Sequence, residues 1–257
     1  MTVRELKVEN IKVKIFPTKE ELGLAAAQHA AEVIARLAPG RANVLFATGT
    51  SQFPLVEGLK KQNIDWQRVY GFHLDEYKGI SPDHPASFRL WLRERIDQQF
   101  KPGAFHYIQG DAPDVEAECQ RYAALLKENP IDVGFIGIGE NGHIAFNDPP
   151  VADFQDKQAV KVVELDEACR KQQLGEGWFP TLDDVPREAV TLTIPTIMSC
   201  KTIISVVPEG RKAQAVRDAL LGPIEHACPA SILRTHPDVT LYLDQESASL
   251  FLRDFEA

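Results

Sequence analysis

The residues best suited to chemistry lie in the segment 131–150, IDVGFIGIGENGHIAFNDPP. Its apolar start has the length and the Val/Ile/Phe content of a buried parallel strand, and glycines and a polar cluster follow. Glycines such as Gly139 let backbone N–H groups approach a ligand closely. Histidine is the side-chain type suited to proton transfer near neutrality, and His143 lies close in sequence to Asn141 and Asp148. We predict a catalytic site here, at the carboxyl edge of a sheet; the alternative is a structural histidine in an ordinary turn.

The segment Thr48-Gly49-Thr50-Ser51 is the second candidate. It follows a predicted strand and precedes a predicted short helix, so free N–H groups and hydroxyls suited to a phosphate would lie together. It is not a Walker A loop, because the pattern G-x-x-x-x-G-K-[ST] is absent. The alternative is an ordinary strand–helix turn with Ser/Thr capping.

Two more predicted strand ends carry charged residues. Asp75 and Glu76 leave a buried strand, and adjacent side chains of an extended chain point in opposite directions. We expect one acid to face the site and the other to anchor the loop; a helix or turn cap is the alternative. Lys212 begins a predicted helix, where a positive charge is mildly unfavourable unless an anion is near. It is a candidate phosphate partner for the loop at Thr48, and the alternative is a solvated lysine.

The elements that must position these residues alternate between strand and helix, which predicts an α/β fold with a mainly parallel sheet and helices on both faces. Thr18 and Glu21 have capping-box spacing ahead of the first helix. We expect residues 1–257 to form one domain, with an irregular lid at about 151–186. The predicted strands are 43–47, 68–74, 105–108, 131–138, 159–166, 190–194, 202–208 and 239–243, and the predicted helices are 20–37, 53–61, 87–100, 114–128, 211–221 and a terminal helix.

Composition and charge narrow the function classes. The formal net charge of −9 disfavours a nucleic-acid-binding surface. No apolar run approaches the roughly 20 residues that span a bilayer, and the N-terminus lacks a secretory h-region. The 4 cysteines are widely spaced, which predicts reduced, mostly buried thiols rather than a disulfide framework or a zinc site. We therefore expect a soluble cytoplasmic protein that binds neither nucleic acid nor a membrane.

Two long motifs resemble the glucosamine-6-phosphate deaminase family, a branch of the fold shared with 6-phosphogluconolactonases. They are FHLDEY (72–77) and GIGENGHIAFNDP (137–149). The resemblance extends over most of the chain: residues 48–51 are similar to the family's phosphate loop, and 211–213 to its late phosphate-binding lysine motif. Residues 165–170 look like the segment that bears its phosphate-binding arginine. Tyr77 and the stretch 144–147 favour the deaminase branch over the lactonase branch.

The resemblance implies a modified Rossmann-like fold and an aldose-to-ketose isomerisation with loss of ammonia, without cofactor or metal. The substrate would be glucosamine 6-phosphate, a small phosphorylated amino sugar, and the products fructose 6-phosphate and ammonia. Asp75 would be the base that moves a proton from C2 to C1. His143 would assist ring opening, oriented by Asn141 and Asp148, where many members of the family have Asp and Glu. The residues implied in binding the sugar or its phosphate are Thr48, Gly49, Thr50, Ser51, Glu76, Gly139, Arg170 and Lys212.

Two other functions remain open at this stage. In a 6-phosphogluconolactonase-type hydrolase, His143 would be the base that activates water. In a sugar-phosphate-binding protein without catalysis, the phosphate loop alone would bind the ligand. The presence of Asp75 argues for an enzyme instead. The segment 175–180 differs from the usual lid of the family, and the oligomeric state is left open, a homo-oligomer included.

Overall fold

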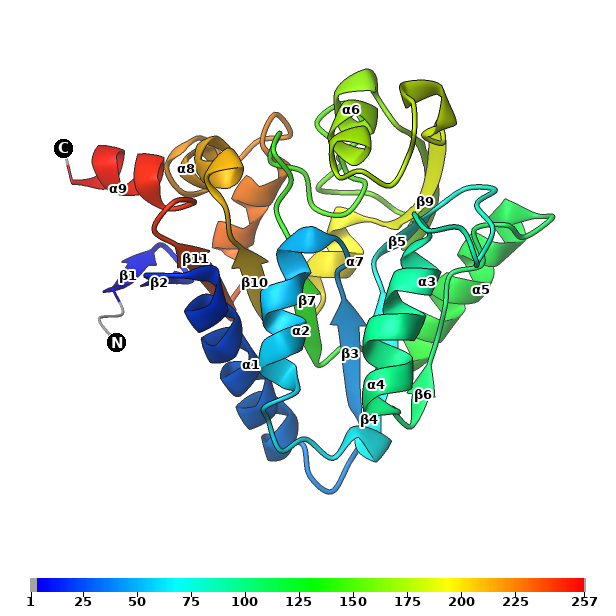
Figure 1. The fold of residues 1–257 in the computed structure, drawn as a ribbon, viewed down its shortest axis with the longest axis horizontal. Helices are drawn as coiled ribbons and strands as arrows, with labels where there is room; N and C mark the ends of the chain where they lie inside the picture. Colours follow the sequence, from blue (N-terminus) through cyan, green and yellow to red (C-terminus); the bar gives the residue numbers. More distant parts are fainter. Residues whose placement is uncertain (1–3, 257) are drawn as a thin grey trace.

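An eight-stranded sheet forms the centre of the computed structural model, which describes residues 4–256 (Figure 1). All neighbouring strands in it run parallel except the first pair, β1 and β2. The predicted mainly parallel α/β sheet is therefore confirmed. The order across the sheet is β1 (Arg4–Val8), β2 (Ile11–Phe16), β11 (Val239–Asp244), β10 (Thr202–Val207), β7 (Val133–Ile136), β3 (Ala42–Phe46), β4 (Val69–His73) and β6 (Ala104–Phe105).

Helices cover both faces of this sheet, as the near-continuous apolar character of its central strands requires. Alternate residues of β3 show this: Leu45 belongs to one apolar core, whereas Val44 and Phe46 belong to the other. The helices on the Val44 side are α1 (Lys19–Arg36), α2 (Phe53–Leu59) and α3 (Phe88–Leu92), and those on the Leu45 side include α5 (Val115–Glu128), α7 (Ile194–Met198), α8 (Ala213–Leu221) and α9 (Ser249–Phe255).

Most predicted helices begin and end within a few residues of the observed ones. The Oγ1 atom of Thr18 accepts a hydrogen bond from the backbone N–H of Glu21 at 3.2 Å, so the predicted cap of α1 is present. The predicted helix 87–100 consists of α3, a π-helical turn (Arg93–Asp97) and α4 (Gln98–Phe100). No helix within residues 4–256 is long and apolar enough to cross a membrane.

A second, three-stranded antiparallel sheet lies beyond the arrowhead of β3 in Figure 1. Its order is β5 (Asp75–Tyr77), β9 (Glu188–Leu192) and β8 (Val160–Glu164). The chain leaves the main sheet at His73 and enters this one at Asp75, so a single residue joins the two sheets. Nothing in the strand pattern alone separates β8 and β9 from the main sheet. This small sheet holds Asp75 above the carboxyl ends of the parallel strands.

The segment 151–186, which we expect to be an irregular lid, contains regular structure. After β8 it forms α6 (Glu167–Gly175) and a short 3-10 helix (Leu182–Asp184). The carboxylate of Asp166 accepts a hydrogen bond from the backbone N–H of Cys169 at 2.7 Å and so caps α6. The helix carries few apolar residues, which is why its periodicity is weak in the sequence. In Figure 1, α6 lies above the carboxyl edge of the main sheet.

Candidate active site

One pocket at the carboxyl edge of the main sheet collects residues from separate strand ends. Such an edge is where open α/β sheets bind ligands. The loop after β3 contributes Thr48, Gly49 and Ser51, the start of β5 contributes Asp75, the loop after β7 contributes Gly139 and His143, and the end of the loop after β10 contributes Lys212. The structure therefore brings together the main candidates from all the strand ends that the sequence singles out.

Asp75 lies in the wall of this pocket and is only 7% exposed. Burial raises the pKa of its carboxyl group well above the ordinary value, and the nearby carboxylates of Glu76 and Asp148 raise the pKa further. A carboxylate whose affinity for a proton is increased in this way is a stronger base than an exposed aspartate. Asp75 can therefore remove a proton from carbon more readily than an ordinary aspartate.

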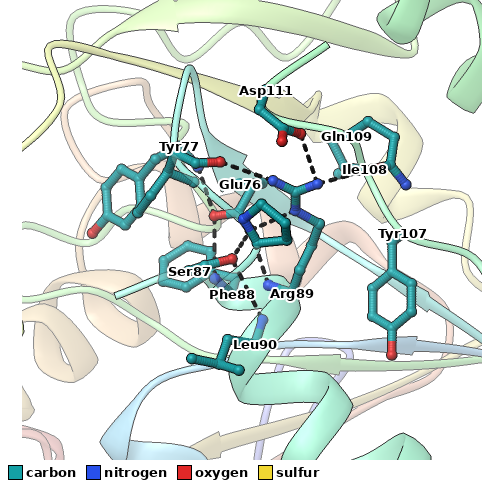
Figure 2. Close-up of polar contacts among 12 residues, drawn as sticks. Glu76, Tyr77, Ser87, Phe88, Arg89, Leu90, Tyr107, Ile108, Gln109 and Asp111 are labelled. Carbon is teal, nitrogen blue, oxygen red and sulfur yellow. Dashed lines mark hydrogen bonds and ion pairs between the residues drawn. The ribbon is translucent and has the colours of Figure 1, made fainter. Parts of the chain in front are cut away.

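Glu76 points away from the pocket, as the alternation of an extended strand predicts. It anchors the loop through the polar contacts drawn in Figure 2. Its fully buried carboxylate accepts hydrogen bonds from the Ser87 hydroxyl (2.7 Å) and from the backbone N–H groups of Tyr77, Phe88 and Arg89 (2.9, 3.1 and 2.9 Å). The last two are free N–H groups at the start of α3. The side chain of Glu76 therefore faces α3, whereas a residue that binds substrate is expected to face the pocket.

The guanidinium of Arg89 extends this anchor toward the loop after β6 (Figure 2). Its Nε lies 3.4 Å from the carboxylate of Glu76. Its Nη1 donates hydrogen bonds to Gln109 and to Asp111, at 2.9 and 2.8 Å. Its Nη2 donates to the carbonyl of Ile80 at 2.8 Å. The strand that carries Asp75 is thus fixed from its buried side.

His143 is held by both of its predicted partners. Its Nδ1 lies 2.8 Å from Oδ1 of Asp148, and its backbone N–H donates to Oδ1 of Asn141 at 3.1 Å. The Asn141 amide also donates to Oδ1 of Asp148 at 2.8 Å. Burial works against ionisation of Asp148, but the contacts with His143 and Asn141 lower its pKa overall. Because Nδ1 faces the Asp148 carboxylate, Nε2 is the ring nitrogen left for a ligand.

Gly139 allows this position of the imidazole. A Cβ placed on Gly139 would lie 2.2 Å from Cε1 and 2.3 Å from Nε2 of His143. The ring therefore packs directly against the glycine backbone, and a larger residue would displace it. Gly139 also lines the pocket, where we expect it to contact the sugar.

Lys212 and the 48–51 loop form the other end of the pocket. Lys212 is 4% exposed, and burial, followed by the charge of Arg211, lowers its pKa. Thr50 lies outside this pocket, and its Oγ1 accepts a hydrogen bond from Nη2 of Arg211 at 3.3 Å. The loop adopts a left-handed conformation at Gly49 (φ +95°), which a side chain would strain. A cation and free N–H groups thus lie at one end of the pocket, an arrangement suited to an anion.

Arg170 does not lie with these residues. Its Nε donates to the carbonyl of Val185 at 3.2 Å, and its Nη2 donates to the carbonyl of Leu182. The guanidinium therefore ties α6 to the turn that follows it. The phase of α6 turns the Arg170 side chain away from the pocket in which we expect the phosphate.

The side of α6 that faces the pocket carries residues that the sequence does not single out: Gln172, Gln173 and Glu176. The hydroxyl of Tyr77 donates to Oε1 of Gln173 at 2.8 Å, and the backbone N–H of Glu140 donates to Oε1 of Gln172 at 3.2 Å. The spacing of Gln172 and Glu176, one helical turn, is the signal that could identify this face once a helix is assumed. Gly175 and Gly177 make this segment resemble a loop, so the sequence alone does not indicate the helix.

The comparisons with known proteins agree with this geometry. Residues 17–242 match the family model of glucosamine-6-phosphate isomerases/6-phosphogluconolactonase. A glucosamine-6-phosphate deaminase of Exiguobacterium sibiricum is 39% identical over 240 residues, which cover 93% of either chain. One of Listeria innocua is 38% identical over 232 residues, 88% of this chain and 96% of the relative.

Two solved structures have a similar fold. The structure of a monomeric glucosamine-6-phosphate deaminase has a TM-score of 0.85 at 36% identity and covers 93% of this chain and 99% of its own. A 6-phosphogluconolactonase from Shewanella baltica has a TM-score of 0.75 at 20% identity, with coverage of 94% and 99%, which is likeness of fold alone. The resemblance predicted from the motifs is confirmed, and the chain belongs to the family of glucosamine-6-phosphate isomerases and 6-phosphogluconolactonases.

Proposed function

We propose that this protein converts glucosamine 6-phosphate to fructose 6-phosphate and ammonia. The observation that carries the proposal is the buried carboxylate of Asp75 in one pocket with His143 and Lys212. The reaction needs a positioned base near C1 and C2, an acid–base group at the ring oxygen and a cation at the phosphate. The 39% and 38% identical relatives named as glucosamine-6-phosphate deaminases support the same reaction.

His143 acts first, on the cyclic sugar. Its Nε2 takes the proton of the anomeric hydroxyl and delivers a proton to the ring oxygen, which opens the ring to the aldehyde. Asp148 holds Nδ1–H and stabilises the imidazolium while the proton is on the ring. Asn141 fixes the direction of this carboxylate without adding charge.

Asp75 then moves one proton between adjacent carbons. It takes the proton from C2 while the C1 oxygen takes a proton from the ammonium group of the substrate, which gives an enolamine. The proton on Asp75 passes to C1 and leaves an imine at C2. Water adds to this carbon and ammonia leaves, so that C2 becomes the ketone of fructose 6-phosphate. The raised pKa of Asp75 suits a group that both accepts and returns a proton.

The phosphate is bound at the other end of the pocket, far from the reacting carbons. Lys212 provides the positive charge, and the backbone and hydroxyls of Thr48, Gly49 and Ser51 provide hydrogen bonds. Binding energy at this end positions C2 over Asp75, which is how a non-reacting group of a substrate raises the rate.

The test is an assay with two substrates. Purified protein is incubated with glucosamine 6-phosphate, and ammonia is measured; a parallel sample receives 6-phosphogluconolactone, and its hydrolysis is measured. We expect ammonia release and no acceleration of lactone hydrolysis over the buffer rate. Lactone hydrolysis without ammonia release would show that His143 activates water instead, and loss of both would contradict an enzymatic function for this pocket.

A further inference from the structure

Glu176 brings a carboxylate to the phosphate end of the pocket. It caps the C-terminal end of α6 and lines the pocket together with Ser51 and Lys212. A Cβ placed on Gly49 would lie 3.6 Å from Oε2 of Glu176, so the carboxylate lies against the backbone of the 48–51 loop. A negative charge belonging to the protein therefore lies where we place the phosphate of the substrate.

The groups that face this carboxylate are mainly cations. Burial raises the pKa of Glu176, and the positive charges of Lys212 and Arg211 oppose this rise. The Arg211 guanidinium is already paired with Glu209 at 2.7 Å and with Glu140 at 3.2 Å. Within residues 4–256, no carboxylate forms an ion pair with the Lys212 ammonium. Lys212 is thus the cation in the pocket that an incoming anion and Glu176 share.

The space on both sides of Glu176 is open, although the backbone N–H groups of Glu176 and Gly177 are hydrogen-bonded to α6. Glycines precede and follow Glu176, and no other part of the chain lies within 4 Å of a Cβ placed on Gly175 or on Gly177. Gly177 has a φ of +84°, which a residue with a side chain rarely adopts. The body of α6 is held separately, through Gln172 and Gln173. The side chain of Glu176 therefore has room to rotate out of the pocket while the backbone of α6 stays in place.

We propose that Glu176 determines the anion specificity of the pocket by competing with the substrate phosphate for Lys212. A carboxylate and a phosphate dianion at the same end of the pocket repel each other. The phosphate therefore binds only when the Glu176 side chain moves out of the pocket or takes up a proton. A dianionic phosphate interacts more strongly with Lys212 than the carboxylate does, whereas a monoanionic sugar acid has no such advantage. Glu176 thus selects against weaker anions. The substrate named here rests on the proposed function, but the competition needs only an anion in the pocket.

Glu176→Gln removes the charge and keeps the shape of the side chain. Binding of inorganic phosphate to the parent and the variant is measured by isothermal titration calorimetry, and KM is measured with glucosamine 6-phosphate. We expect the Kd of inorganic phosphate and the KM each to fall about tenfold, and acetate to bind measurably to the variant. The matched control is Glu167→Gln, which removes a charge from an exposed position of the same helix that pairs with Lys171, and it should leave both constants unchanged.

Unchanged phosphate binding in Glu176→Gln would overturn the inference, because Glu176 would then have no effect on the ligand. Weaker binding would overturn it as well, because Glu176 would then be a hydrogen-bonding partner of the ligand. The calorimetric measurement does not depend on turnover. Tighter phosphate binding in a protein that releases no ammonia would therefore leave the competition standing and contradict only the proposed reaction.

Discussion

The Nδ1 atom of His143 lies 2.8 Å from Oδ1 of Asp148. The turn between the two residues brings their side chains together. Ala145 has a φ of +52°, and Ile144 and Asn147 form an isolated β-bridge that folds the segment back on itself. The Asn147 amide also donates to the carbonyl of Ile144 at 2.9 Å. The backbone thus brings the carboxylate to the imidazole.

Asp148→Asn tests this pair. An amide of the same size cannot stabilise the imidazolium, so we expect kcat to fall about 10–100-fold through slower ring opening. KM should change little, because the phosphate end of the pocket is intact. Steady-state ammonia release measures both constants, and Glu167→Gln, which removes an exposed carboxylate outside the pocket, is the control that should stay as active as the parent. An Asp148→Asn variant as fast as the parent would contradict the role of the pair.

The pH profile tests the state of Asp75. Its pKa is raised by burial and by the carboxylates of Glu76 and Asp148, and the form that removes the C2 proton is the carboxylate. Activity therefore needs a pH above the raised pKa and is lost as the pH falls through it. The acid limb of kcat/KM should lie well above pH 4, where an ordinary aspartate titrates at about 3.9. Circular dichroism over the same range separates this limb from acid unfolding, and a limb near pH 4 would contradict the assignment.

Glu76→Ala tests the anchor below Asp75. The variant leaves the N–H groups of Phe88 and Arg89 without their acceptor and removes the more deeply buried of the two carboxylates that face the Arg89 guanidinium. We expect the free energy of unfolding to fall by about 3 kcal/mol, measured by urea denaturation. Ser87→Ala removes one of the donors to Glu76 and should cost only about 1 kcal/mol. Equal losses in the two variants would show that the carboxylate is not the centre of this network.

Lys212 and Arg170 form a contrasting pair. Lys212 lines the pocket, so Lys212→Ala should raise KM for glucosamine 6-phosphate about 10–100-fold and leave the free energy of unfolding nearly unchanged. Arg170 donates to backbone carbonyls outside the pocket, so Arg170→Ala should lower the free energy of unfolding by about 2 kcal/mol and leave KM unchanged. A higher KM in Arg170→Ala, with Lys212→Ala like the parent, would reverse the two assignments.

The sequence predicts those features that follow from local pattern. Apolar runs predict the parallel strands, because a strand buried on both faces is apolar on both. The position of polar residues directly after these strands predicts that Asp75, His143 and Lys212 meet, because parallel strands end at the same edge of the sheet. The alternation of a strand also predicts that Asp75 and Glu76 diverge.

The features that the sequence does not predict depend on tertiary contacts. The direction of Arg170 is set by the phase of α6, and that phase follows from packing against residues distant in sequence. The small antiparallel sheet is missed for a similar reason, since β5 pairs with β9 across more than a hundred residues of chain. Gln172 and Glu176 are missed because polar residues close to Gly175 and Gly177 resemble a loop.

The central claim is tested most directly by product analysis of the parent and of Asp75→Asn with glucosamine 6-phosphate. The variant removes a buried carboxylate whose ionisation is unfavourable, so it should fold at least as stably as the parent. We expect the parent to form fructose 6-phosphate and ammonia in equal amounts, and Asp75→Asn to form neither while still binding the phosphosugar in calorimetry. Undiminished formation of both products by Asp75→Asn would contradict the account.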